Sequence, residues 1–173
     1  QDVIKIDIKR KQLWFEKYNW FLSSDDYLVV SGKDAKSNEY LVKNMMTEYD
    51  LYVHSDLPGS GSCIITNPNK ISAESIPDRT KEEACLFVVV HTKAWEQNAP
   101  GVAYWVKSEQ VSKTPESGEY VTLGSFIVRG KRNYLPSQNL IMGYGILFWN
   151  GDKLTRIFNT DTKFALITCA PYT

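Results

Sequence analysis

The sequence has few residues that could ligate a metal ion or form disulfides. Its three cysteines, Cys63, Cys85 and Cys169, lie far apart among 173 residues, and it has only two histidines. It contains no Cys-x-x-Cys pair, so the ligand spacing of a structural zinc site is missing. An odd number of isolated cysteines is also typical of a reducing compartment. We therefore expect no metal, no cofactor and a cytoplasmic location.

Several other sequence signals are missing. No apolar run approaches the roughly 20 residues that a membrane helix requires, and segment 1–5 does not resemble a signal peptide. The chain does not begin with methionine, so we expect a fragment of a longer protein. The nucleophile elbow, the kinase motifs and the dinucleotide-binding fingerprint are missing too. These absences predict a non-enzymatic protein that does not contact a membrane.

The total charge predicts no particular partner, because 20 basic and 20 acidic residues cancel. A polyanionic partner must therefore be argued from local clusters of cations. The hydrophobic content of 43% is sufficient for a packed core. The length suits one domain, with room for extensions.

The residue pattern predicts a mixed α+β (α/β-type) fold in a single domain. Its sheet would be twisted and mostly antiparallel, packed by one long and one or two shorter helices. The last β-prone run, 140–149, has apolar residues or glycine at both odd and even positions, including Gly143 and Gly145. It therefore predicts a buried central strand that another backbone approaches closely. The expected strands, of which the first two would form a hairpin, are 20–23, 27–30, 50–55, 63–66, 102–107, 124–128 and 140–149.

Helices are expected in three places. Asp34 is a suitable N-cap for a helix at about 35–46. The run from Thr80 to Glu83 has the pattern of a capping box that opens the longest helix, at about 81–97. This helix would be buried against the sheet, with His91 as a core histidine. Residues 5–18 mix cations with aromatic residues at helical spacing, which predicts a basic amphipathic helix.

Cations gather in loops beside the ends of expected strands, where binding residues are common. Three of them surround Gly130, directly after the expected strand 124–128. Glycine permits a tight turn, so this corner would suit a phosphate backbone. The alternative is that each charge is merely solvated, because binding requires the cations to converge in space. The candidates for phosphate contact are Lys33, Lys113, Arg129, Lys131 and Arg132.

His54 and Asp56 form a second candidate site. A His-x-Asp pattern at the end of a strand can direct both side chains to one face, as a hydrolase or metal site requires. No third ligand is identifiable, and the other interpretation is a hydrogen bond from His54 into the glycine-rich loop 56–62. We expect a pocket beside the cations, shaped by Asp34, Asn38, His54, Asp56, Gly59 and Ser60.

Several motifs occur in the order found in a known family. With them, the chain resembles the RNA-binding (NFACT-R) domain of the NFACT family over about residues 10–149. It resembles the eukaryotic nuclear export mediator factor members more than the bacterial fibronectin-binding-protein-like members. One departure is Pro58, which stands where members tend to have histidine. The motifs are residues 14–24 (WFEKYNWFLSS), 27–35 (YLVVSGKDA), 50–56 (DLYVHSD), 124–126 (GSF) and 129–136 (RGKRNYLP).

The resemblance implies an RNA-binding module without catalysis of its own. It implies that full-length relatives bind the large ribosomal subunit obstructed by peptidyl-tRNA. Those proteins would recruit charged tRNA to extend the stalled chain and help a ubiquitin ligase to engage. The partners expected from it are therefore tRNA, large-subunit rRNA and the large ribosomal subunit, with the ligase reached through the full-length protein.

The same resemblance divides the chain into three segments. Residues 1–18 would be a basic helical stub, as at the end of a coiled-coil arm, and residues 19–150 the RNA-binding domain. Residues 151–173 resemble the start of the family's C-terminal (NFACT-C) module. Two alternatives stay open for the function. One is a protein–protein interaction module of the same factor, and the other is a small metal-free hydrolase that uses His54 and Asp56.

Overall fold

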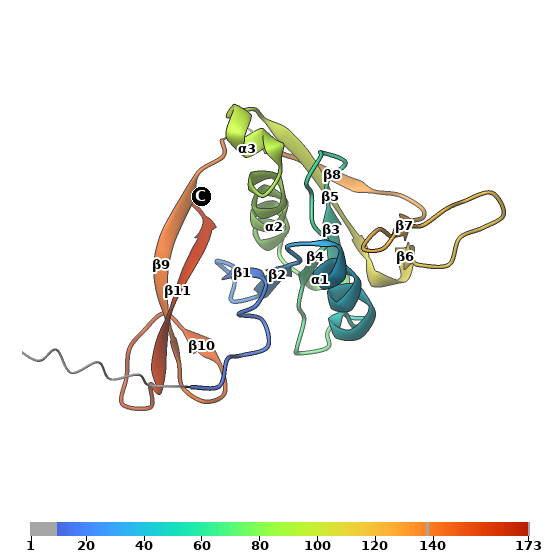
Figure 1. Ribbon diagram of the computed structural model, residues 1–173. Coiled ribbons are helices and arrows are strands. Elements are labelled where there is room, and N and C mark those ends of the chain that lie inside the picture. The colour runs from blue at the N-terminus through green and yellow to red at the C-terminus, as the bar shows by residue number, and fades with distance from the viewer. Residues whose placement is uncertain (1–9, 138, 173) are drawn as a thin grey trace, which may run out of the picture.

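An antiparallel sheet forms the centre of the molecule (Figure 1). The computed structural model describes residues 10–137 and 139–172, and in that part six strands pair in the order β1-β2-β4-β3-β5-β8. Every pairing in this sheet is antiparallel. The strands are β1 (Asn19–Leu22), β2 (Leu28–Ser31), β3 (Leu51–His54), β4 (Cys63–Ile65), β5 (Gly101–Lys107) and β8 (Asn133–Ser137).

Two smaller antiparallel sheets and a few helices complete the described part of the chain. The mixed α+β class expected from the sequence is thus confirmed. One small sheet pairs β6 (Val111–Ser112) with β7 (Ile127–Val128), and the other has the order β10 (Leu154–Thr155), β9 (Met142–Trp149), β11 (Phe164–Pro171). The helices are α1 (Ala35–Tyr40), α2 (Asp78–Val90), α3 (Lys93–Gln97) and two 3₁₀ turns, Ala73–Ser75 and Ser108–Gln110.

Helix α2 packs against one face of the six-stranded sheet, and β11 also contacts it (Figure 1). Ten of its thirteen residues are buried, as the apolar sequence predicts. Phe87 is 1% exposed and its ring lies 4.6 Å from that of Phe21 on β1. The face of the sheet under α2 is supplied by alternate strand residues such as Leu51, Val53 and Ala103.

The expected capping box at the start of the long helix is wrong. The helix begins at Asp78, directly after Pro77, so Thr80 already lies inside its first turn. The buried hydroxyl of Thr80 donates to Asp25 at 2.8 Å and lies 2.8 Å from the Ser23 hydroxyl. Glu83 accepts from the Ser24 backbone N–H at 2.9 Å. These polar groups therefore attach the helix to the β1–β2 turn instead of capping it.

The expected helix 81–97 is also interrupted. The Thr92 hydroxyl donates to the Val89 carbonyl at 2.6 Å and accepts from the Ala94 N–H at 3.2 Å. A threonine that bonds the backbone in this way competes with helix continuation, and α3 starts anew with Thr92 as its N-cap. His91 is the C-terminal cap of α2 and is exposed, so its assignment to the core was wrong.

Helix α1 follows the sequence prediction closely. The Asp34 carboxylate accepts from the Ser37 N–H at 2.7 Å, and the Ser37 hydroxyl oxygen accepts from the Asp34 N–H at 2.9 Å. The helix continues as a π-helical turn over Leu41–Met45, which covers most of the expected range 35–46. In this turn the buried Leu41 clusters with Val30 and Ile64, and the buried Val42 clusters with Tyr52, so the turn packs on the face of the sheet opposite α2.

The amphipathic helix expected at 5–18 does not form in the part of that segment that the structure describes. Residues 14–17 form a turn, and residues 5–9 lie outside the described residues. The Glu16 carboxylate binds the Arg10 guanidinium at 2.6 and 2.7 Å and accepts from the Leu13 N–H at 2.6 Å. Phe15 and Tyr18 are both 3% exposed. The aromatic residues therefore dock on the sheet from a turn, where helical spacing had indicated a helix.

Strand β9 is central in its own sheet, but the expectation that it is buried was wrong. It pairs with β11 along its whole length, from Met142 opposite Pro171 to Trp149 opposite Phe164. Only one face is covered, and Tyr144 on the other is 87% exposed. A Cβ added at Gly145 would meet nothing within 4 Å, so nothing packs over the sheet at that position. This ladder pairs residues on both sides of position 150, where the sequence analysis expects one segment to end and the next to begin.

No helix among the described residues is long and apolar enough to cross a membrane. The three cysteines are free. Cys63 and Cys85 are fully buried, and burial raises the pKa of the Cys85 thiol to about 12. They therefore act as small apolar core residues at neutral pH.

We predict that the contact between α2 and the sheet dominates stability. Phe87→Ala removes a buried ring and should lower the free energy of unfolding by about 3–5 kcal/mol, since the core closes only partly over the cavity. Urea unfolding followed by circular dichroism measures this change. Tyr144→Ala, which removes an aromatic ring that is 87% exposed, is the control. Equal losses in the two variants would contradict this account of the core.

Candidate functional site

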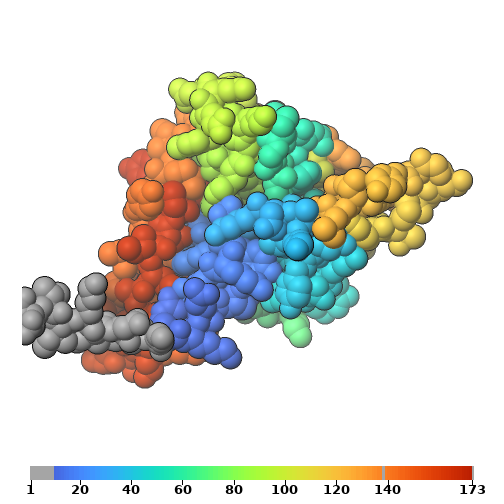
Figure 2. Space-filling view, in the orientation of Figure 1, coloured from blue at the N-terminus to red at the C-terminus, as the bar shows by residue number. Residues whose placement is uncertain are grey.

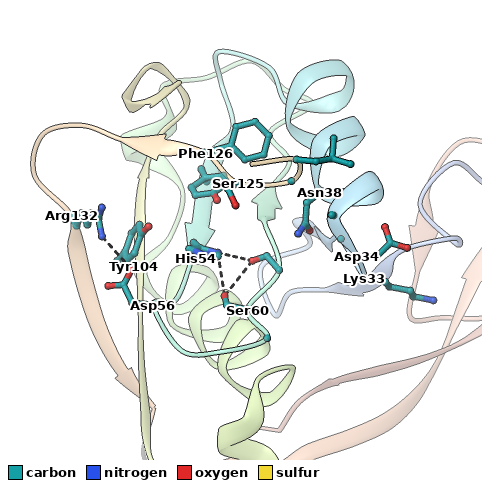
Figure 3. Close-up of a pocket in the computed structure, with 17 residues that line it drawn as sticks. Lys33, Asp34, Asn38, His54, Asp56, Ser60, Tyr104, Ser125, Phe126 and Arg132 are labelled. Atoms are coloured by element: carbon teal, nitrogen blue, oxygen red, sulfur yellow. Dashed lines mark hydrogen bonds and ion pairs between the residues drawn. The ribbon is translucent and has the colours of Figure 1, made fainter. Parts of the chain in front are cut away.

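A pocket of about 520 Å³ lies on the face of the sheet opposite α2 (Figure 3). It is bordered by the segment that leads into α1, the loop between β3 and β4, strand β5, and residues 123–126. All six residues expected to shape a pocket line it, together with Lys33 and Arg132. Folding thus brings together positions about a hundred residues apart in the sequence.

Two glycines allow the pocket's segments to meet. The Gly32 N–H donates to the Ser62 carbonyl at 2.9 Å, and the Ser62 N–H donates to the Asn38 side-chain oxygen at 3.0 Å. A Cβ at Gly32 would lie 2.1 Å from that oxygen, and one at Gly61 would lie 2.5 Å from the Gly32 carbonyl oxygen. Sequence reasoning missed both glycines, although each stands in a small-residue loop beside a strand end.

His54 is fixed by a hydrogen bond into the glycine-rich loop, which is the structural interpretation weighed above. Its Nδ1 lies 2.8 Å from the Gly61 carbonyl oxygen and 3.2 Å from the Ser60 hydroxyl. A carbonyl only accepts, so Nδ1 carries the proton, and Nε2 of the neutral ring is an acceptor. Burial lowers the pKa of His54, which favours this neutral form at physiological pH.

Asp56 does not orient His54. Its carboxylate faces Arg132 at 3.4 Å, and no hydrogen bond joins it to His54 within the described chain (Figure 3). In the same part of the chain, no group of three or more His, Cys, Asp or Glu residues could hold a metal ion. The geometry that a His–Asp hydrolase needs is therefore not assembled between these two side chains.

Three rings form a row across neighbouring strands, and two of them, His54 and Tyr104, line the pocket. His54 pairs in register with Tyr104 on β5, and Tyr104 pairs with Tyr134 on β8. The Arg132 guanidinium carbon lies 4.7 Å from the centre of the Tyr104 ring, a cation–π distance. Burial raises the pKa of Tyr104 to about 12, so its hydroxyl stays neutral. Sequence reasoning missed Tyr104, which only the strand register could have revealed.

The predicted basic corner is held by a glutamine. Strand β7 has only two residues, too few to fix the turn that follows it. Instead the Gln110 side-chain amide donates to the carbonyls of Arg129 and Lys131 at 2.8 and 2.9 Å, and the Arg129 N–H donates to the Gln110 carbonyl at 2.9 Å. Gly130 adopts a φ of +78° in this turn, as a tight glycine corner requires.

The five candidate cations differ in their surroundings. Lys33 and Arg132 line opposite sides of the pocket (Figure 3). Arg129 pairs with Glu119 at 2.8 Å and with Glu116 at 3.4 Å. Within the described part of the chain, neither Lys33 nor Lys131 has an acidic partner, and both are exposed. Those two lysines are thus the most available for an external anion.

Lys113 is held inside the structure. Its ammonium donates to Glu39 at 2.7 Å and to the carbonyls of Thr122 and Ser125 at 2.7 and 2.9 Å. Glu39 also accepts from Lys43 at 2.7 Å and from the Gly124 N–H at 2.8 Å. These donors hold the pKa of Glu39 down at about 2.

The contacts of Glu39 anchor the loop of residues 113–126 to α1. Figure 2 shows this loop projecting from the body of the molecule, in gold. At its base, a Cβ on Gly124 would lie 2.5 Å from the Ala35 Cα, so the two backbones are in close contact. The anchor positions Ser125 and Phe126 as one wall of the pocket.

Residues 17–130 match the family described as "NFACT protein RNA binding domain". The chain belongs to the NFACT family. Every residue that lines the pocket except Arg132 falls within the matched range. The family expected from the sequence motifs is confirmed, and the pocket is part of its RNA-binding domain.

Relatives of this NFACT-R chain are much longer proteins. It is 47% identical to the human protein "Ribosome quality control complex subunit NEMF" over 178 aligned positions, which cover 98% of this chain and 16% of the human protein. It is 41% identical to "Ribosome quality control complex subunit 2" of Schizosaccharomyces pombe, over 88% of this chain and 15% of that protein. The chain therefore spans about a sixth of the length of these relatives.

A solved structure shares the fold of this NFACT-R chain. It is the C-terminal part of the fibronectin/fibrinogen-binding protein from Streptococcus suis, with a TM-score of 0.57 and 19% sequence identity. The match covers 78% of this chain and 49% of that chain. At this identity the likeness shows a common mixed α+β architecture.

We predict that the Glu39 contacts stabilise the fold in a pH-dependent way. Because the pKa of Glu39 falls from 4.5 to about 2 on folding, its stabilisation is complete above pH 4.5 and is lost as the pH falls through about 2. Glu39→Gln should therefore unfold at lower urea concentration than the wild type at pH 7. The difference should shrink steadily between pH 4.5 and 2.

The control for this series is Glu82→Gln, which neutralises an exposed carboxylate on α2. Urea midpoints measured across the pH range should differ little between Glu82→Gln and the wild type. A Glu39→Gln midpoint equal to that of the wild type at pH 7 would show that Glu39 does not anchor the loop.

Proposed function

We propose that this chain is the part of a ribosome quality control factor that contacts tRNA, and with it large-subunit rRNA, on an obstructed large ribosomal subunit. In the full-length cytoplasmic protein, this contact would help to recruit charged tRNA for extending the stalled chain. A ubiquitin ligase would be engaged through other parts of that protein. The observation that carries the proposal is the match of residues 17–130 to an RNA-binding domain family.

The geometry of the pocket supports RNA as the partner. Lys33 and Arg132 line a pocket that also contains neutral polar and aromatic side chains and the carboxylates of Asp34 and Asp56. Lys131 directly precedes Arg132 in the sequence. RNA-binding surfaces combine cations for the phosphates with hydrogen-bonding and aromatic groups for unpaired bases. Lys113 contributes by holding the pocket wall, because its ammonium is already bound by three acceptors.

Binding rather than catalysis is the role that the site supports. The Nδ1 proton of His54 is held by the Gly61 carbonyl, and Asp56 faces Arg132. A general base needs a partner that orients it and a nucleophile within hydrogen-bond reach. Among the described residues, no carboxylate orients His54. The Ser60 hydroxyl lies 3.2 Å from Nδ1, but this nitrogen already carries the proton that the Gly61 carbonyl accepts, so it cannot take a proton from Ser60.

One observation favours the second candidate, a protein-binding module. The outer face of the β9–β11 sheet carries Tyr144, Ile146 and Ile167, which are 87%, 58% and 74% exposed. Exposed apolar patches of this kind are often interaction sites. This candidate and RNA binding make opposite predictions for a titration with tRNA at low salt.

We predict that Lys33 and Lys131 each contact a phosphate. Binding of tRNA should weaken as salt increases, because bound cations release counterions from the RNA. The double variant Lys33→Ala with Lys131→Ala should reduce the slope of log affinity against log salt by about 1.4 to 1.8 units, or about 0.7 to 0.9 for each phosphate. Filter binding over a range of salt concentrations measures this slope.

The matched control is Lys153→Ala with Lys163→Ala. Both lysines are exposed and directly precede β10 and β11 in the sequence. Figure 1 shows these strands on the other side of the molecule from α1 and β5, which border the pocket. This variant has the same net charge as the first and should keep the wild-type slope. Equal slopes in the two double variants would remove Lys33 and Lys131 from the interface. No tRNA affinity at low salt in the wild type would favour the protein-binding module.

A further inference from the structure

The hydroxyl of Tyr104 has no hydrogen-bond partner within the described part of the chain, although the residue is only 2% exposed. Its neighbour on the same face, Tyr52, is equally buried, and its hydroxyl lies 3.0 Å from the Ser62 hydroxyl. Among the described residues, the buried side-chain nitrogen or oxygen that lacks a partner is Oδ1 of Asn67, so the Tyr104 hydroxyl is not sealed in the core but reaches open space. Tyr104 lines the pocket (Figure 3), so its hydroxyl is available to a group that enters there.

Two further polar atoms around the same pocket are available. The side-chain oxygen of Asn38 is occupied by the Ser62 N–H, which leaves its NH₂ group as a donor. Nδ1 of His54 is occupied by Gly61, which leaves Nε2 as an acceptor. In the described residues no hydrogen bond reaches either atom. The pocket therefore offers donors and an acceptor, all carried by neutral side chains.

The charges around the pocket also limit what it holds. The lining contains two cations, Lys33 and Arg132, and two carboxylates, Asp34 and Asp56, so its formal charges cancel. A pocket built for a bare phosphate would carry an excess of cations. Cancelled charges combined with unpaired neutral donors and acceptors favour a neutral polar group.

We propose that the pocket holds one unpaired RNA nucleotide, whose base or ribose edge hydrogen-bonds to Tyr104, His54 and Asn38. Its flanking phosphates lie toward Lys33 and Arg132, on opposite sides of the pocket. The volume of about 520 Å³ is in the usual range for small-molecule sites, and Phe126 adds an aromatic wall. This inference rests on the proposed RNA-binding function and adds that an unstacked nucleotide is recognised, as in sequence-specific RNA binding.

The test measures binding of single-stranded RNA trinucleotides and of tRNA to the chain. Tyr104→Phe removes only the hydroxyl and keeps the ring on which Arg132 stacks. It should weaken trinucleotide binding about three- to tenfold, the usual effect of one hydrogen bond. The salt dependence of tRNA binding should stay unchanged, because no charge is lost. The control is Tyr144→Phe, which removes an exposed hydroxyl on β9 and should have no effect.

A second variant tests the acceptor. In His54→Asn the amide NH₂ lies near the position of Nδ1 and keeps a donor for the Gly61 carbonyl, whereas the Nε2 acceptor is lost. It should weaken trinucleotide binding by a similar factor. Thermal unfolding of each variant checks that the fold is retained.

The outcomes separate the nucleotide pocket from the proposed RNA-binding function. Wild-type trinucleotide affinity in both pocket variants would overturn the nucleotide pocket, and intact, salt-dependent tRNA binding would leave the proposed function standing. Competition by inorganic phosphate as strong as that by a nucleoside monophosphate would show a phosphate site and overturn the pocket as well. If the wild type binds neither tRNA nor trinucleotide at low salt, the proposed function and the pocket both fall.

Discussion

The site depends on the close contact between the backbones of Gly32 and Ser62. Their hydrogen bond continues the β2–β4 ladder by one step beyond the pair Ser31 and Cys63. Asn38 closes the contact from α1. Because a side chain at Gly32 would collide with Asn38, only a residue without Cβ permits this approach. The contact places the start of α1 over the end of β3, which is why segments far apart in the sequence share one pocket.

Sequence reasoning succeeded where structure is determined locally. The Asp34 cap and the β1–β2 hairpin depend on neighbours within a few residues, and both were predicted. The capping box at Thr80 was wrong because the residues that bind Thr80 and Glu83 belong to the turn after β1, more than fifty residues away. Thr80 and Glu83 have the residue types of a capping box, but their side chains bind the β1–β2 turn.

The same limit applies at the candidate site. Lys113 has the loop position of a phosphate contact, yet its carboxylate partner is 74 residues away in the sequence and could not be inferred from it. The exposure of β9 is a related case. Apolar residues at both odd and even positions predict a strand that is covered on both faces, whereas β9 is covered on one face only. The six residues expected to shape a pocket, from Asp34 to Ser60, do line one pocket, and their role in binding stays a prediction.

The sheet and the loops would contribute to ligand binding in different ways. The sheet fixes the row of His54, Tyr104 and Tyr134 by strand register, so their hydrogen-bonding atoms are in place before a ligand arrives. The cations stand on loops, and the exposed pairs Arg129–Glu119 and Arg132–Asp56 contribute little to stability. An incoming phosphate can therefore replace either carboxylate at small cost. On the proposed function, His54 and Tyr104 would decide which group fits the pocket, and the loop cations would decide how strongly the RNA that carries this group is held.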